Sequence, residues 1–187
     1  EAIKGVMISK YRNAGQTCVC TNRILVQHSV YDEFLSKFKA ECENLVVGNG
    51  LCEETTIGPL INRKAAADVK DLIEDAKSKG AISELGENNN AYGDCYVEPT
   101  ILSNINTSMR VFREEIFGPV APIIKFESED EAVELANKTE FGLAAYFYSR
   151  DIGRIYRVSE ALEFGIVGVN EGIISNEMAP FGGIKES

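Results

Sequence analysis

Helical and strand-like patterns alternate along most of this chain, and the alternation limits the folds it can adopt. Short runs rich in branched or aromatic apolar side chains, typical of buried strands, occur at residues 24–27, 121–126, 144–148 and 165–169. Helical patterns with an apolar stripe occur at residues 2–13, 29–45, 62–79, 129–137 and 152–162. Such alternation favours crossover connections, so we predict an α/β fold with a mainly parallel sheet flanked by helices.

The length and the apolar content fit one packed domain. The chain has 187 residues, of which 44% are hydrophobic, and this is enough for a sizeable core. Residues 86–94, with three consecutive asparagines and two glycines, are the expected mobile loop.

Cys18 lies between the first expected helix and the first expected strand. The apolar stripe of residues 2–13 leaves out Lys10, and Gly15 is a natural stop for that helix. A loop fixed between two packed elements can expose a sulfur without letting it move, which suits a nucleophile. A free cysteine is more often a small buried hydrophobic residue, so Cys18 alone does not separate a catalytic role from a structural one.

Four segments stand in a characteristic order. Residues 15–18 read GQTC, residues 114–120 read EEIFGPV, residues 140–145 read EFGLAA, and NEG at 170–172 is followed by PFGGIK at 180–185. Each segment alone is a weak signal. Together, in this order and spacing, they resemble the aldehyde dehydrogenase superfamily, and the resemblance covers essentially the whole chain.

The resemblance implies a cysteine nucleophile and a nicotinamide cofactor, either NAD or NADP. Cys18 matches the residue that attacks the aldehyde carbon, and its own backbone N–H matches one donor to the oxyanion that forms. Glu115 matches the acid that accepts hydrogen bonds from the nicotinamide ribose hydroxyls, a role that suits a carboxylate. Phe117 matches the aromatic residue that borders the nicotinamide. The alternatives are a surface acid for Glu115 and a core aromatic for Phe117.

A narrower resemblance points to the succinate-semialdehyde dehydrogenase branch of that superfamily. It is carried by Arg12, by Cys20 and by the GIIS segment at 172–175. In that branch an arginine and a serine, here Arg12 and Ser175, hold the distal carboxylate of the substrate, and a guanidinium offers a carboxylate a planar fork of donors. Phe181 matches an aromatic of the substrate pocket. A solvated cation is the alternative for Arg12, and a core position for Phe181.

The reaction that this resemblance implies is the oxidation of succinate semialdehyde to succinate through a cysteine thiohemiacetal and a thioester. Other semialdehydes are the alternative substrates. The sequence has no Gly-x-Gly-x-x-Gly loop, no general-base segment of the family and no Trp. We therefore interpret residues 1–187 as the catalytic domain of a longer enzyme, with the cofactor-binding domain and a final assembly strand outside it. We expect the parent to be a homo-oligomer and the isolated chain to be a folded module without turnover.

Charge and cysteine content narrow the remaining classes. The net charge of −10 argues against nucleic acid or an anionic membrane as a partner and leaves a small-molecule aldehyde as the expected one. Five cysteines, an odd number at irregular spacing, do not form a disulfide framework and indicate a cytoplasmic protein. A single histidine and no Cys-x-x-Cys pair argue against a metal site.

Two further hypotheses concern Cys18. Its closeness to Cys20 in sequence would allow a strained, reversible disulfide that blocks the nucleophile. A thiol hydrolase dyad of Cys18 with His28 is a rival from another enzyme class, although a lone histidine beside a strand is usually structural.

Overall fold

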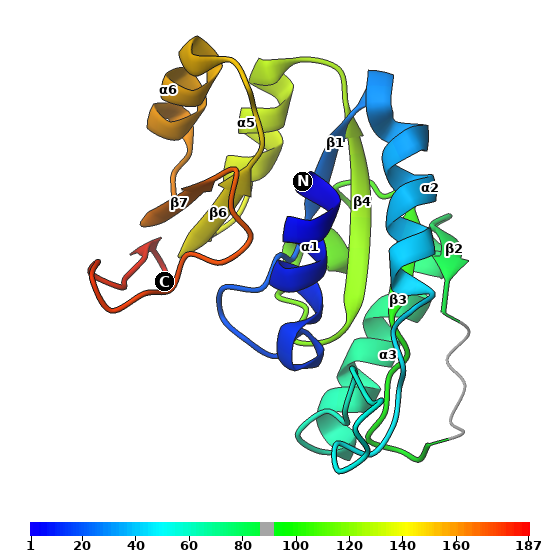
Figure 1. The fold of residues 1–187 in the computed structure, drawn as a ribbon. Helices are drawn as coiled ribbons and strands as arrows, with labels where there is room; N and C mark the ends of the chain where they lie inside the picture. The colour runs from blue at the N-terminus through cyan, green and yellow to red at the C-terminus, as the bar shows by residue number, and fades with distance from the viewer. Residues whose placement is uncertain (87–91) are drawn as a thin grey trace.

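A computed structural model of the protein describes residues 1–86 and 92–187 (Figure 1). The loop predicted over residues 86–94 is centred on residues that lie outside this description, and it stays a prediction. The predicted fold class is confirmed, because helices flank sheets whose strand pairs are mostly parallel.

A four-stranded sheet with the order β1-β4-β3-β2 forms the core of the molecule. Both β1 (Ile24–Gln27) and β3 (Thr100–Ser103) pair parallel with β4 (Val120–Phe126). At the edge, β2 (Ile82–Leu85) pairs antiparallel with β3. The first five residues of β4 are all buried, as expected for a central strand that is covered on both faces.

Three helices pack around this sheet, namely α1 (Ala2–Tyr11), α2 (Tyr31–Cys42) and α3 (Arg63–Ser78) (Figure 1). The Asn62 side chain caps α3, because its Oδ1 accepts a hydrogen bond from the N–H of Ala65 at 2.8 Å. The helix ends two residues before Gly80, which has a φ of +97°. The helix predicted over residues 62–79 is therefore confirmed to within one residue at each end.

The later part of the chain forms a smaller unit beside β1 (Figure 1). Its strands β6 (Ala144–Phe147) and β7 (Ile166–Val169) pair parallel, and its helices are α5 (Glu129–Asn137) and α6 (Ile152–Ala161). These four elements match the predicted ones. In the described part of the chain, however, β6 pairs only with β7 and β1 only with β4, and a cavity of about 700 Å³ lies between β1 and β6.

Several short elements were not predicted. They are β2, β3, a single helical turn α4 (Arg110–Arg113), and the antiparallel pair of β5 (Phe141–Gly142) with β8 (Ile184–Lys185). Although β3 is buried throughout, its four residues begin and end in hydroxyl side chains, so no long apolar run marks it. None of the described helices is long and apolar enough to cross a membrane.

Candidate active site

Cys18 follows a turn in left-handed backbone conformation. The first helix ends two residues earlier than predicted, since Asn13, Ala14 and Gly15 have φ values of 52°, 55° and 78°. A Cβ at Gly15 would lie 2.2 Å from the carbonyl oxygen of Gly118, so a side chain does not fit there. This close approach brings Gly15 against Gly118 of the EEIFGPV segment, which is 103 positions later in the sequence.

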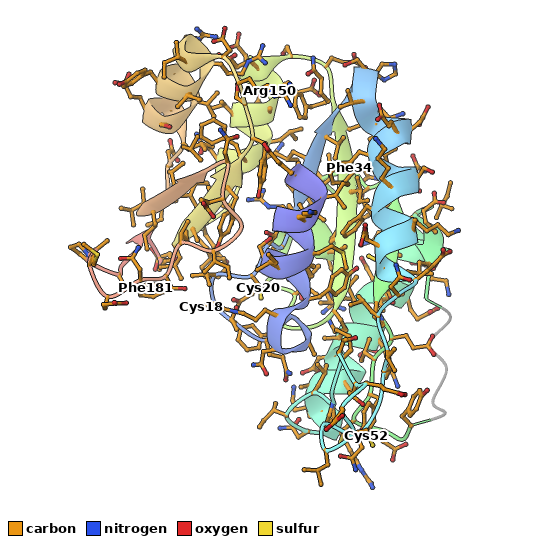
Figure 2. The ribbon with its side chains drawn as sticks, viewed as in Figure 1. Cys18, Cys20, Phe34, Cys52, Arg150 and Phe181 are labelled. Atoms are coloured by element: carbon orange, nitrogen blue, oxygen red, sulfur yellow. The ribbon has the colours of Figure 1, made fainter. Side chains whose placement is uncertain are left out.

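Hydrogen bonds hold the residues that follow, 16–22, which we call the cysteine loop. The N–H of Cys20 donates to the carbonyl of Thr17 at 3.0 Å and closes a turn around Cys18. The hydroxyls of Thr21 and Ser9 are 2.8 Å apart, which ties the loop to α1. Within this turn Cys18 is exposed, whereas Cys20 is only 7% exposed (Figure 2).

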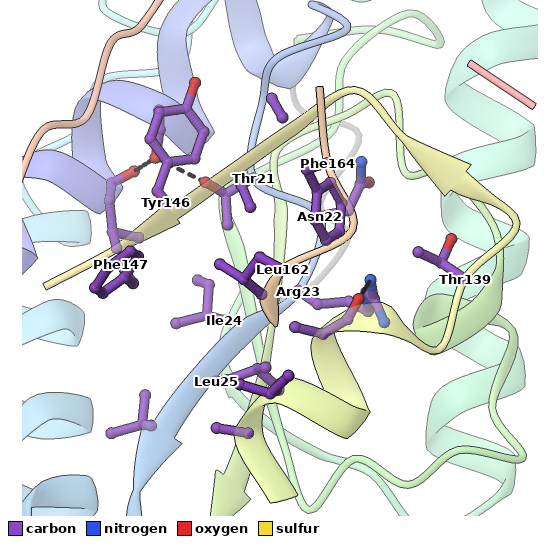
Figure 3. A pocket seen from close by; sticks show the side chains of 18 of the residues that line it. Thr21, Asn22, Arg23, Ile24, Leu25, Thr139, Tyr146, Phe147, Leu162 and Phe164 are labelled. Atoms are coloured by element: carbon purple, nitrogen blue, oxygen red, sulfur yellow. Dashed lines mark hydrogen bonds between the residues drawn. The ribbon is translucent and has the colours of Figure 1, made fainter. Parts of the chain in front are cut away.

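Cys18 lines the large cavity between β1 and β6, whose walls are mainly apolar. Figure 3 shows labelled side chains of β1, of β6 and of the segment after α6 around this space, among them Ile24, Leu25, Phe147, Leu162 and Phe164. The polar residues that line the same cavity include Asn22, Glu114 and Glu115. An exposed thiol therefore shares a mostly apolar cavity with carboxylates.

The two acids of the EEIFGPV segment differ in their partners. Both oxygens of Glu114 accept hydrogen bonds from the guanidinium of Arg110, at 2.7 and 2.8 Å, and this pairing lowers the pKa of Glu114. Glu115 is exposed and has no hydrogen-bond partner among the described residues. The N–H of Ile116 donates to Oδ1 of Asn22 at 2.6 Å, so the segment is fastened to the cysteine loop.

Phe117 is 43% exposed, so the alternative of a core aromatic does not hold for it. The neighbouring Ile116, only 1% exposed, fills the core position instead. Phe117 is not among the residues that line the large cavity, whereas Glu115 and Cys18 are.

The residues predicted to hold a substrate carboxylate lie on two segments that meet. Arg12 is exposed and lines a small hollow with Gly172 and Ile173, which come shortly before Ser175 in the C-terminal loop. A Cβ at Gly172 would lie 2.5 Å from the carbonyl oxygen of Gly5, so this loop packs directly on α1. Ser175 is exposed on the same loop.

Phe181 is farther along the C-terminal loop and is 54% exposed, which excludes a core position in this chain (Figure 2). Among the described residues it lines neither the large cavity nor the small hollow. Like Phe117, Arg12 and Ser175, Phe181 is therefore a predicted site residue that does not line the cavity with Cys18.

Two polar residues beside the cysteine loop were missed by the sequence analysis. Lys10, expected off the apolar stripe, is fully buried, and among the described residues its Nζ has no hydrogen-bond partner. The hydroxyl of Tyr146, in β6, donates a hydrogen bond to the carbonyl of Val19 at 2.9 Å. No local pattern marks either residue, because each is placed by a contact with a distant part of the chain.

His28 is not placed to act on Cys18. It follows the end of β1, whereas Cys18 comes before the start of that strand, and a strand rises about 3.3 Å per residue. Its Nδ1 is 3.3 Å from a carboxylate oxygen of Glu127, and both side chains are exposed. In the part of the chain that the structure describes, no group of three or more His, Cys, Asp or Glu side chains could hold a metal ion.

An exposed cysteine on a tightly held turn, in a cavity that it shares with a carboxylate, is the arrangement expected of an α/β enzyme domain with a thiol nucleophile. Sequence comparison makes the class specific. The chain belongs to the aldehyde dehydrogenase family, whose family model matches residues 1–187.

The relatives of this chain include enzymes that are named for different aldehydes. It is 55% identical over 186 residues to a succinate semialdehyde dehydrogenase of Acinetobacter baylyi, covering 100% of this chain and 38% of that protein. It is also 55% identical over 186 residues to a 3-sulfolactaldehyde dehydrogenase of Pseudomonas putida, with the same coverage of 100% and 38%.

A solved structure confirms the fold. The crystal structure of succinate-semialdehyde dehydrogenase from Burkholderia pseudomallei matches with a TM-score of 0.97 and 55% identity, over 98% of this chain and 38% of that one. The chain thus spans less than two fifths of the length of the proteins it matches.

Proposed function

We propose that the chain is the catalytic domain of an NAD(P)-dependent aldehyde dehydrogenase that oxidises succinate semialdehyde to succinate. The observation that carries this proposal is the position of Cys18. It is exposed on a turn that a backbone hydrogen bond closes, and it lines a cavity that Glu115 also lines. Because the chain spans 38% of its relatives' length, the activity is that of a longer protein. We expect that protein to add a cofactor-binding domain, a general base and a final assembly strand, and residues 1–187 alone to lack turnover.

The chemistry of this chain centres on Cys18. Its thiolate attacks the carbonyl carbon of the aldehyde, which forms a carbon–sulfur bond and an oxyanion. The backbone N–H of Cys18 has no hydrogen-bond partner among the described residues, so it is available to stabilise that oxyanion. A nicotinamide held beside Glu115 and Phe117 would supply the acceptor for the hydride of the thiohemiacetal carbon. The thioester that remains on Cys18 is then hydrolysed by water, which releases the acid and restores the thiol.

Glu115 and Phe117 fit one part of a nicotinamide nucleotide. The carboxylate of Glu115 is exposed, lines the cavity with Cys18 and can accept hydrogen bonds from two ribose hydroxyls. The exposed ring of Phe117 is available to a flat heteroaromatic group. The chain has no phosphate-binding glycine motif, so we assign the rest of the cofactor site to the longer protein.

Arg12 and Ser175 are our candidates for the site of the distal carboxylate, with Phe181 lining the substrate pocket of the full enzyme. The contact of the Arg12 turn with the C-terminal loop supports the pairing of Arg12 with Ser175. The second candidate function is an aldehyde dehydrogenase for another anionic aldehyde. It is favoured by the relative named for 3-sulfolactaldehyde, which is as similar to this chain as the succinate semialdehyde dehydrogenase.

The remaining assignments follow the same proposal. We infer that the partner is a small aldehyde rather than nucleic acid or a membrane and that the parent protein is a homo-oligomer. The odd number and irregular spacing of the five cysteines in residues 1–187 support a cytoplasmic location. We also propose, as the sequence predicted, that Cys20 is a redox partner of Cys18. Oxidation by a peroxide would join the two sulfurs, and the block of Cys18 alkylation would be reversed by a dithiol.

Steady-state reduction of NAD and NADP by the full-length protein tests the proposal, with succinate semialdehyde and with butanal, an uncharged aldehyde of the same length. We expect Cys18→Ala to lower turnover by about a thousandfold or more. Arg12→Ala should raise KM for succinate semialdehyde about tenfold or more and leave KM for butanal nearly unchanged.

Arg150→Ala is the matched control, because Arg150 is an exposed arginine on the turn before α6, away from Cys18 (Figure 2). If Cys18→Ala keeps its turnover, the nucleophile is wrong. If Arg12→Ala affects both aldehydes alike, the dehydrogenase assignment stands and the substrate assignment fails.

A further inference from the structure

Tyr146 connects the smaller unit of the molecule to the cysteine loop. Its hydroxyl donates to the carbonyl of Val19 at 2.9 Å, and Val19 is the residue directly after Cys18. The acceptor lies inside the turn that the Cys20–Thr17 hydrogen bond closes. The position of the Cys18 backbone is therefore coupled to the position of β6.

The ring of Tyr146 also contacts the strand that leads to the C-terminal loop. A Cβ at Gly168, in β7, would lie 3.0 Å from Cδ1 of Tyr146 and 2.5 Å from Cγ2 of Ile174. The Tyr146 ring and Ile174 thus both pack against the bare backbone of Gly168. Ile174 directly precedes Ser175, and Tyr146 lines the small hollow together with Gly172 and Ile173. The Tyr146 side chain therefore lies beside both the cysteine loop and the loop of the candidate carboxylate site.

Arg12 completes this group. It lines the same small hollow as Tyr146 and Val19, and its positive charge acts on the Tyr146 phenol. Burial raises the pKa of Tyr146 to about 12, and Arg12 opposes part of that shift. The hydroxyl consequently stays protonated, and able to donate to Val19, over the whole pH range in which the protein would be assayed.

We propose that Tyr146 is a positioning residue, which sets the place of Cys18 relative to Arg12 and Ser175. Its hydroxyl holds Val19, and its ring packs against Gly168 beside Ile174. The carboxylate side of this role rests on the function proposed above. The placement of the Cys18 thiol does not, because it follows from the hydrogen bond alone.

The test compares Tyr146→Phe with Tyr148→Phe in the full-length protein. Both variants lose one hydroxyl from the same chain segment, but the Tyr148 hydroxyl lies against Gly5 of α1 and not against the cysteine loop. Tyr146→Phe keeps the ring that packs on Gly168, so the fold is expected to survive, and near-ultraviolet circular dichroism checks this.

The first readout is the second-order rate at which iodoacetamide alkylates Cys18, followed by peptide mass spectrometry between pH 6 and 10. We expect a change of about threefold or more in Tyr146→Phe and none in Tyr148→Phe, as for the loss of one hydrogen bond to a carbonyl. Equal alkylation profiles in the two variants and the wild type would overturn the proposal. A change in melting temperature alone would not rescue it, because that change would report stability and not the placement of Cys18.

The second readout is kcat/KM for succinate semialdehyde and for butanal. Tyr146→Phe should lower both, and the loss should be about threefold larger for the semialdehyde, because only that substrate needs the thiol and the carboxylate site in register. An equal loss for both aldehydes would overturn the link to Arg12 and Ser175. If the wild type has no dehydrogenase turnover at all, the proposed function fails, and the alkylation rates still decide the role of Tyr146.

Discussion

A buried amine lies close to the cysteine loop. Lys10 in α1 is 0% exposed, and its Nζ has no hydrogen-bond partner among the described residues. Burial lowers the pKa of Lys10 from 10.5 to about 8, against the smaller opposing effects of Cys20 and Glu115. The unfolded chain keeps the ordinary pKa and therefore binds more protons than the folded chain between pH 8 and 10.5. Stability should consequently rise with pH across that window.

This predicts that Lys10 destabilises the folded protein at neutral pH. Lys10→Met keeps much of the side-chain volume and removes the buried charge, so we expect it to increase the free energy of unfolding at pH 7, by at most on the order of 3 kcal/mol. The stability difference from wild type should shrink as the pH rises to about 10.5. Urea unfolding at several pH values measures this.

Lys4→Met is the matched control, because Lys4 is exposed on the same helix. A Lys10→Met variant that is less stable than wild type at pH 7 would contradict the prediction. It would show that the amine finds an acceptor in the protein in solution.

At the scale of elements, a carboxylate at the start of α5 fastens that helix to α6. Glu129 accepts hydrogen bonds from Nε of Arg157 at 2.8 Å and from Nε of Arg154 at 2.9 Å. These contacts, Arg157 first, lower the pKa of Glu129 from 4.5 to about 2. The folded state therefore keeps this carboxylate ionised at a pH where the unfolded chain protonates it. The stabilisation is full above about pH 4.5 and is lost as the pH falls towards 2.

We therefore expect Glu129→Gln to lower the melting temperature at pH 6 and to differ less from wild type at pH 3. Thermal unfolding followed by far-ultraviolet circular dichroism at the two pH values measures the difference. Glu134→Gln, an exposed acid on the same helix, serves as the control and should behave like wild type at both. A constant difference between Glu129→Gln and wild type at pH 6 and pH 3 would show that this ion pair does not set the acid sensitivity.

At the scale of the whole molecule, two packed units meet along the large cavity. Among the described residues, the side chains of Arg23 and Tyr146 form hydrogen bonds that bridge them. Arg23 donates to the carbonyls of Leu135 and Ala136 at the end of α5, at 2.8 and 2.9 Å, while Tyr146 holds Val19. In the described chain, β1 and β6 each keep one edge without a partner strand, and residues of both line the cavity. Unpaired edges beside an apolar cavity favour association with other chains.

Residues 1–187 expressed alone should therefore self-associate. We expect sedimentation velocity to show species larger than a monomer, increasing with concentration, and the fluorescence of anilinonaphthalene sulfonate to rise on binding to the apolar cavity. The full-length protein, in which we propose that further segments cover these faces, should bind less of the dye. If the chain stays monomeric at about 100 μM and binds no dye, the expectation that it self-associates through these faces is contradicted.

Much of the fold could be predicted because local sequence patterns mark most of its helices and strands. The helices α3, α5 and α6 have strong 3.6-residue periodicity or clear caps, and β1, β4, β6 and β7 are apolar runs with branched or aromatic side chains. The short strand β3 was missed, since its place in the core comes from pairing with β4 and not from its own composition. The split into two units was also missed, because no local pattern says which edges pair.

By itself, the sequence determined the fold class, the family and the identities of Cys18, Glu115 and Arg12 as candidates, because motif order and hydrophobic period are local properties of a chain. Only the tertiary structure decided that Cys18 and Glu115 line one cavity and that Phe117 and Phe181 do not line it. It also decided that Lys10 is buried and that Tyr146 holds the cysteine loop. Burial and long-range hydrogen bonds depend on which segments pack together in space, and that information is not contained in any one segment.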